Sequence, residues 1–121
     1  MNKDVLLAIS PYLKKYYFNE KYKELPKDIK NELIEDLAAI AEKINGIITI
    51  GFEEDGDIYF EERYEDPMFY DEIGGQLEIR RLQREKQSLF EALKLWYQIY
   101  HTEQGEEIKK TLIDNNNNSK A

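Results

Sequence analysis

Two runs of β-branched and aromatic residues, separated by an acidic turn, constrain this chain more than any other feature. The runs are Ile47–Phe52 and Ile58–Phe60, and Asp55-Gly56 lies between them. Such residues favour strands, and an Asp-Gly pair tolerates the positive φ that a two-residue hairpin turn requires. The sequence therefore predicts a β-hairpin. Because a lone hairpin is marginal in water, it must pack on helices or pair with another strand, for which Val5–Ile9 is the candidate.

Two other segments have the three- and four-residue spacing of apolar residues that is typical of amphipathic helices. The first begins at Pro26, because proline favours the first helical position, and it ends at Asn45-Gly46, which supplies a left-handed stop. The second is predicted as one long C-terminal helix from about Asp71 to Tyr100. The predicted fold class is α+β, with two main helices packed on a small antiparallel β-hairpin or three-stranded sheet.

The two ends of the chain give weaker signals. The proline after Ser10 disfavours helix, so Val5–Ile9 is interpreted as a short strand or a single helical turn. An extended or irregular aromatic stretch, expected to lie over the core, follows it. At the other end, Asn115–Ala121 is a polar run without an apolar anchor. The sequence thus predicts one domain over residues 1–101 and a disordered tail over residues 102–121.

Composition excludes several classes of protein. The chain has no cysteine, which rules out disulfides, thiolate nucleophiles and cysteine-bound zinc. The apolar run Val5–Ile9 is too short for the core of a signal peptide, and no stretch approaches the roughly 20 apolar residues that cross a bilayer. We therefore expect a cytoplasmic protein that does not engage a membrane.

The net charge of -8 is concentrated in one short segment. Residues 1–50 carry eight basic and eight acidic side chains, residues 51–75 carry one and ten, and residues 76–121 carry eight and seven. The middle segment therefore has a net charge of -9. Because an acidic field repels phosphate backbones, direct nucleic-acid binding is not expected.

The acidic segment is the candidate binding site. Its acids do not follow the order of an EF-hand loop, so no metal site is expected. One interpretation is a solvated turn that only keeps a small protein soluble. The functional interpretation is that acids interleaved with aromatic residues hold a basic protein by charge and anchor it by apolar contact. The predicted partner-binding residues are Glu53, Glu54, Asp55, Asp57, Glu61, Glu62, Tyr64, Tyr70, Asp71 and Glu72.

A single basic stretch lies on the second predicted helix. It could grip phosphate, but acids are interspersed in it and the acidic segment lies immediately before it. We therefore expect its charges to pair within the chain, with Asp71, Glu72 or the hairpin. The basic residues are Arg80, Arg81, Arg84 and Lys86.

No residue pattern points to catalysis. His101 is the only histidine and lies at the expected end of the second helix, where the helix dipole favours a cation. Neither a nucleophile with its base nor a phosphate-binding or metal-binding motif is present, so we expect no catalytic residue, no metal and no cofactor. Trp96, Tyr97 and Tyr100 are expected in the core. If the apolar stripe of the second helix is wider than the core covers, a homodimer through that helix follows.

Six short motifs distributed along residues 5–100 give the chain a resemblance to a known family. They are Lys15–Asn19, Leu25-Pro26 with Ile29-Lys30, Gly46-Ile47, the Asp55-Gly56 hairpin, Tyr70–Gly74, and Leu82–Lys86 with Leu89–Leu93. In these motifs the chain resembles an uncharacterised family of small acidic proteins from clostridia. That family has no assigned activity, so the resemblance implies no catalytic residue, cofactor or partner. It implies a free-standing bacterial protein.

Three functions follow as hypotheses. The first is a non-enzymatic interaction or regulatory protein that binds a basic protein partner through the acidic hairpin and the adjoining aromatic segment. The alternative is an acidic nucleic-acid mimic of the phage-inhibitor type, which would need carboxylates along an extended ridge at roughly phosphate spacing. The third, an enzyme, would need a deep pocket that collects polar groups from the hairpin and the helix.

Overall fold

The elements are arranged as two hairpins, each followed by helix, and the computed structural model describes them in residues 3–12, 15–66, 68, 72–103, 105 and 110. The strands are β1 (Asp4–Ser10), β2 (Lys15–Phe18), β3 (Ile47–Phe52) and β4 (Ile58–Arg63). The helices are the short 3-10 helix η1 (Glu20–Tyr22), α1 (Lys27–Ile44), α2 (Glu72–Glu85) and α3 (Gln87–His101). The described residues thus form an α+β fold, which confirms the predicted class.

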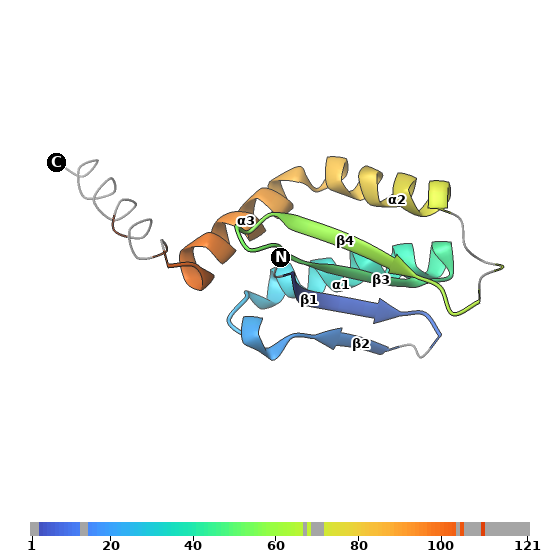
Figure 1. The fold of residues 1–121 in the computed structure, drawn as a ribbon, viewed down its shortest axis with the longest axis horizontal. Coiled ribbons are helices and arrows are strands. Elements are labelled where there is room, and N and C mark those ends of the chain that lie inside the picture. The colour runs from blue at the N-terminus through green and yellow to red at the C-terminus, as the bar shows by residue number, and fades with distance from the viewer. Residues whose placement is uncertain are drawn as a thin grey trace.

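The sheet has four antiparallel strands in the order β2-β1-β3-β4 (Figure 1). Of the two interpretations of Val5–Ile9, a short strand or a single helical turn, the structure has the strand, which lies inside the sheet with a bulge between Val5 and Leu7. The sequence predicts an extended or irregular stretch after it, but Lys15–Phe18 is a regular strand that pairs with β1. The sheet is therefore one strand wider than predicted.

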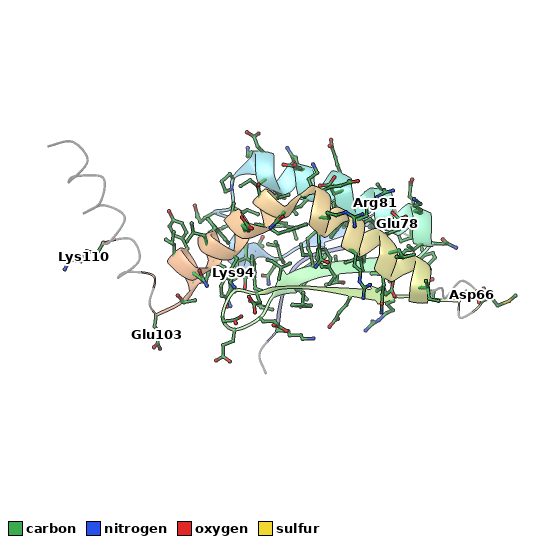
Figure 2. All side chains as sticks on the ribbon, turned by 90° about the horizontal axis from the view of Figure 1, so that it is seen from above. Asp66, Glu78, Arg81, Lys94, Glu103 and Lys110 are labelled. Atoms are coloured by element: carbon green, nitrogen blue, oxygen red, sulfur yellow. The ribbon has the colours of Figure 1, made fainter. Side chains whose placement is uncertain are left out.

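Helices cover one face of the sheet, and no described helix covers the other (Figures 1 and 2). Alternate residues of each strand point into the covered face, because the side-chain period of a strand is two. There they pack on the apolar stripes of α1 and α3. The largest fully buried side chains are Leu6, Leu7, Tyr22, Leu33, Leu37, Ile48, Ile50, Phe52 and Leu93. Within the described residues, no helix is both long enough and apolar enough to cross a membrane.

Helix α1 confirms the first predicted helix. It begins directly after Pro26, and its buried face is formed by residues at three- and four-residue steps, Leu33 and Leu37 among them. It ends at Asn45, whose φ of 53° is left-handed and whose N–H bonds to carbonyls of the last turn. Asn45, and not Gly46, therefore supplies the left-handed residue of the predicted stop.

The prediction of one long helix over residues 71–100 is wrong, because α2 and α3 are separate helices that meet at Lys86. A straight helix of about 30 residues spans about 45 Å, whereas a six-residue strand spans about 20 Å. The break lets α2 pack on α1 and α3 pack on the sheet, where the ring of Phe90 lies 5.6 Å from that of Phe60. Lys86, at the break, forms an ion pair with α1, in which its Nζ lies 2.6 Å from Oε1 of Glu32.

The aromatic residues before α1 lie only partly over the core. Tyr22 is fully buried, but Tyr16 and Tyr17 on β2 are 53% and 57% exposed. The prediction that this whole stretch covers the core is therefore wrong for Tyr16 and Tyr17, whereas Phe18 of the same strand does pack against the core. The tail predicted over residues 102–121 lies almost entirely outside the described residues.

Candidate functional site

The turn between β3 and β4 is longer than the predicted two-residue turn. The Glu53 N–H donates to the Asp57 carbonyl at 2.8 Å, and the Gly56 N–H donates to the Glu53 carbonyl at 2.9 Å. Within the turn, only Gly56 has a positive φ, at 97°. This pattern is that of a three-residue hairpin loop, in which a type I turn is followed by a left-handed glycine. The Asp55 carboxylate, which accepts from the Asp57 N–H at 3.0 Å, favours that turn type.

The turn packs directly on the last turns of α3. A side chain at Gly56 would lie 3.2 Å from atoms of both Tyr97 and Gln98, and the φ of 97° strains other residues, so this position favours glycine. The Gln98 side-chain amide donates to the Asp55 carbonyl at 3.1 Å, and Lys94 Nζ lies 2.5 Å from Asp57 Oδ1. The hydrogen bond from Lys94 lowers the pKa of the Asp57 carboxyl, and the same bond raises the pKa of Lys94. The acidic turn is thus attached to a helix at three points.

Three carboxylates of the turn lie close enough to share a cation. One oxygen each from Glu53, Asp55 and Asp57 lies within 4.8 Å of the others. Carboxylate oxygens are ligands of Ca²⁺ and Mg²⁺, so these residues have suitable donors. The Lys94 ammonium already neutralises part of this charge, and the arrangement can equally bind the cationic side chain of a protein.

Behind the turn lies a cluster of aromatic rings around Tyr22. Its ring centroid is 5.2 Å from that of Phe52, 6.0 Å from Trp96 and 4.8 Å from His101, and all three pairs are edge-on. Tyr97 stacks on Phe52 at 4.6 Å. Edge-on and stacked pairs at these distances add stability beyond their buried area, so the cluster is a firm support for the end of the sheet.

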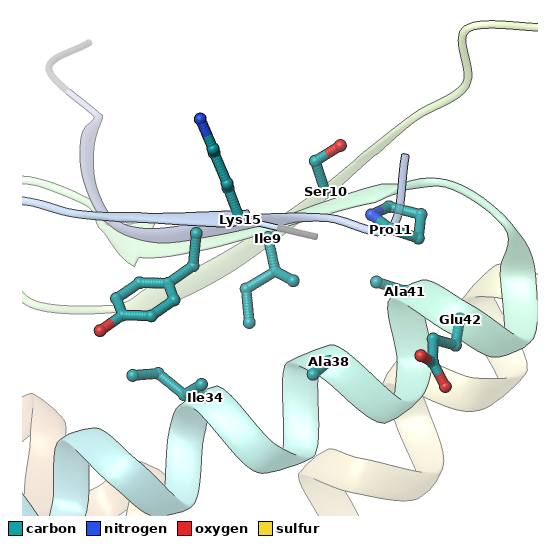
Figure 3. A pocket seen from close by; sticks show the side chains of 9 residues that line it. Ile9, Ser10, Pro11, Lys15, Ile34, Ala38, Ala41 and Glu42 are labelled. Atoms are coloured by element: carbon teal, nitrogen blue, oxygen red, sulfur yellow. The ribbon is translucent and has the colours of Figure 1, made fainter. Parts of the chain in front are cut away.

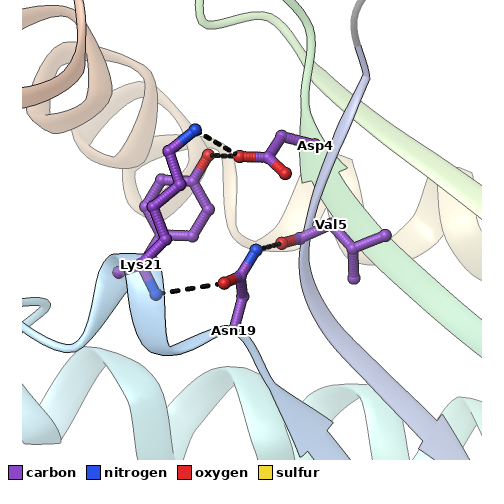
Figure 4. A network of polar contacts seen from close by, with 5 residues as sticks. Asp4, Val5, Asn19 and Lys21 are labelled. Carbon is purple, nitrogen blue, oxygen red and sulfur yellow. Dashed lines mark hydrogen bonds and ion pairs between the residues drawn. The ribbon is translucent and has the colours of Figure 1, made fainter.

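A polar network closes the same end of the sheet on its N-terminal side (Figure 4). The Tyr22 hydroxyl donates to the Asp4 carboxylate, and Lys21 Nζ lies 2.8 Å from the same oxygen. The Asn19 amide donates to the Val5 carbonyl at 2.7 Å. Burial alone would raise the pKa of the Asp4 carboxyl, but the hydrogen bonds from Lys21 and Tyr22 outweigh it and hold that pKa below its usual range. Burial and the Asp4 charge raise the pKa of Tyr22 far above its usual value.

His101 belongs to this end of the molecule, although the sequence places it only at a helix terminus. Its ring lies 5.1 Å from Trp96 and stacks on Tyr97 at 5.8 Å. Burial lowers its pKa, and the positive charge of Lys21 adds to that effect, so the neutral ring is favoured. The sequence gives no signal for this grouping, because Asp4, Lys21 and His101 come from segments far apart in the chain.

An open pocket of about 800 Å³ lies between the turn and the end of α3. Its acidic wall comes from Glu54 and Asp55 of the turn and from Glu103 beyond α3, while Tyr97 and His101 supply aromatic surface. Figure 2 shows Glu103 and Lys94 at this end of the molecule, away from Asp66. The lining is completed by Gln98 and Thr102.

The predicted partner-binding residues fall into separate groups. Glu53, Glu54, Asp55 and Asp57 are brought together at the turn. Glu61 lies on the open face of the sheet, 3.8 Å from Lys3 Nζ.

Glu62 and Tyr64 lie at the other end of β4. Glu62 points to the covered face, where a side chain on Gly75 of α2 would collide with its carboxylate, and it accepts a hydrogen bond of 3.2 Å from the Tyr64 hydroxyl. Tyr70 and Asp71 lie outside the described residues, and Glu72 is described only as the first residue of α2. Among the groups that the structure describes, only the turn group contributes to the lining of the pocket, through Glu54 and Asp55.

Two residues of the basic stretch, Arg81 and Lys86, form ion pairs within the described part of the chain, and these pairs are not with the hairpin; the predicted partners Asp71 and the side chain of Glu72 lie outside it. Arg81 lies 3.3 Å from Glu78 and 3.7 Å from Glu85, both on α2. Lys86 pairs with Glu32 of α1, as described above, and Lys43 of α1 lies 2.7 Å from Glu78. The Arg81 pairs lie within α2, whereas Lys43–Glu78 joins α2 to α1 and Lys86–Glu32 joins the break between α2 and α3 to α1.

Comparison with known proteins gives one match. The model of the Family of unknown function (DUF6145) matches residues 3–106, which include every described strand and helix. This agrees with the predicted resemblance to an uncharacterised family. No curated protein and no solved structure matches the chain.

Proposed function

The chain belongs to the Family of unknown function (DUF6145), and we propose that it is a non-enzymatic interaction protein that binds a basic protein partner at the turn end of its acidic hairpin. The observation that carries this proposal is the pocket between the turn and α3, where an acidic wall meets aromatic surface. Carboxylates attract a lysine or arginine side chain, and the half-buried ring of His101 beside them can contact the apolar stem of the same side chain.

The contacts that hold the walls of the pocket in place also support this function. The turn is held on α3 by Lys94 and Gln98, and the rings behind it are packed around Tyr22. A surface that is already ordered loses little conformational entropy when it binds. An exposed acidic turn without such a support would lose more of its binding energy to ordering.

The arrangement of the acids favours this function over a nucleic-acid mimic. The turn carboxylates gather within 4.8 Å of one another, and the neighbouring residues Glu61 and Glu62 point to opposite faces of the sheet. A mimic needs its charges in a line along one surface, and these five acids do not lie in one. We therefore propose the basic partner alone.

The proposal is tested by mapping the binding of a basic probe, an oligo-arginine peptide, on the ¹⁵N-labelled protein by NMR at physiological ionic strength. We expect the largest amide shifts at Glu54, Gly56 and Gln98. Shifts centred on Glu65 and Asp66, or spread evenly over all acids, would show that the peptide responds only to net charge and would contradict the proposal.

A further inference from the structure

The two edges of the sheet differ in how they are covered. In Figure 1, α2 runs alongside β4, and no described element lies beyond β2. An uncovered edge strand presents unpaired backbone N–H and C=O groups that another strand can join. The Asn19 N–H bonds to the Leu6 carbonyl of β1, and the groups of an antiparallel ladder alternate, so those of Tyr16 and Phe18 point away from β1.

A groove lies directly beside this edge, between β2 and α1 (Figure 3). Its volume is about 330 Å³. Ile9 lines it from the sheet, and Ile34 and Ala38 line it from α1. Tyr16 from β2 also lines it and is 53% exposed. An aromatic side chain from a strand added to β2 would enter this groove, because alternate residues of that strand would face α1.

One row of α1 faces β2 and the groove. It consists of Lys30, Ile34, Ala38 and Glu42, at steps of four residues. Lys30 lies over the Phe18 ring at 4.5 Å, and Glu42 borders the other end of the groove. The outward-pointing backbone groups of Tyr16 and Phe18 lie on either side of Tyr17, so an antiparallel second copy of the same strand, related by a two-fold axis at Tyr17, presents the matching donors and acceptors.

We propose that β2 pairs antiparallel with β2 of a second copy of this chain, about a two-fold axis through Tyr17, to form one continuous eight-stranded sheet. Tyr16 of each copy then lies opposite Phe18 of the other, on the side of the helices, and the outward-pointing backbone groups bond to each other. The groove of each copy is filled by these aromatic side chains. A four-residue ladder alone is marginal, so the filling of the two grooves is needed for a stable dimer.

The charge of the chain does not oppose this pairing, although each copy carries -8. The acidic segment includes β4, which lies at the opposite edge of the sheet from β2. In the paired sheet the two β4 strands are seven strand spacings apart, or about 34 Å. That distance is several times the screening length of about 8 Å at physiological salt.

The axis can be tested by cross-linking, because the chain has no cysteine of its own. Tyr17→Cys places two thiols at the axis, where Cα atoms of opposed residues lie about 4.5 Å apart, within the range of a disulfide. The matched control is Tyr16→Cys, whose two copies would lie about 8 Å apart, beyond that range. We expect mild oxidation to give a covalent dimer with Tyr17→Cys and little or none with Tyr16→Cys. Equal cross-linking of both variants, or of neither, overturns the proposal.

A second measurement uses the unmodified full chain and does not depend on oxidation. Sedimentation over a range of concentrations should give a dimer of twice 14.4 kDa. Phe18→Lys should weaken it at least tenfold, because the substitution places a charge opposite Tyr16 of the second copy. A monomer at every concentration, or a dimer that Phe18→Lys leaves unchanged, contradicts the pairing. Neither result bears on the acidic pocket, which lies at another place on the molecule.

Discussion

The two ends of β4 are equally acidic in sequence but are built differently. Four acids lie at the turn end, Glu53, Glu54, Asp55 and Asp57, and four lie at or beyond the other end, Glu61, Glu62, Glu65 and Asp66. The turn end is attached to α3 and backed by aromatic rings. At the other end, Glu61 and Glu62 point to opposite faces, and the chain leaves the sheet after Arg63.

This difference shows that local charge alone does not define a binding surface. At the turn end, tertiary contacts gather the carboxylates beside aromatic surface and hold them in place. At the other end the same number of acids is spread over both faces of the sheet and a loop. If the contacts behind the turn stabilise that end, substitutions there should lower the free energy of unfolding more than matched substitutions at the other end.

The largest effect is expected from removing a ring behind the turn. Phe52 is fully buried and stacks on Tyr97, so Phe52→Ala should lower the free energy of unfolding by about 3–5 kcal/mol. The matched variant is Tyr64→Ala at the other end, where the ring is half-buried, and about 1–2 kcal/mol is expected there. Urea unfolding of both variants gives the comparison, and equal losses would mean that the two ends are supported equally.

A smaller effect is expected from the hydroxyl of Tyr22. Tyr22→Phe keeps the ring but removes the hydrogen bond to the Asp4 carboxylate, which should cost about 1–2 kcal/mol near neutral pH. The folded-state pKa of Asp4 lies below its usual value of 3.8, so this stabilisation is present above that value and is lost as the pH falls through the folded pKa. Unfolding measured at neutral and at acidic pH should therefore show a difference that shrinks in acid. A difference that is independent of pH would contradict the assigned bond.

The smallest effect concerns His101. Its folded-state pKa lies below the usual 6.5, so its contribution to stability is full above pH 6.5 and is lost as the pH falls through the folded pKa. His101→Gln should remove this part of the acid sensitivity, and thermal unfolding of both proteins between neutral and mildly acidic pH measures it. If the variant loses as much stability as the parent over this range, His101 does not titrate as described.

Local patterns of the sequence predict much of the fold. The Asp55-Gly56 signal places the hairpin, and the apolar spacing of α1 with Asn45-Gly46 places that helix almost to the residue. These features depend on neighbours in the chain. The strand Lys15–Phe18 depends on pairing with β1, and the break at Lys86 depends on contacts with α1, so neither has a local signal.

The candidate site is predictable only in part for the same reason. Charge counting locates the acidic turn, which does line the pocket. The groups behind it are Asp4, Tyr22 and His101, from the start of the sheet, the loop before α1 and the end of α3. No spacing in the sequence connects these segments, since only the antiparallel order of the sheet brings them together.

Calorimetric titration of an oligo-arginine peptide tests the central claim most directly. Two variants are compared with the parent: Glu54→Lys with Glu103→Lys at the pocket, and Glu65→Lys with Asp66→Lys at the other end. Each replaces two acids by two lysines and so changes the net charge of -8 by the same four units. We predict at least a tenfold weaker Kd for the pocket variant, or about 1.4 kcal/mol, and a change of less than about threefold for the other. Equal weakening by both variants would contradict a binding site at the turn.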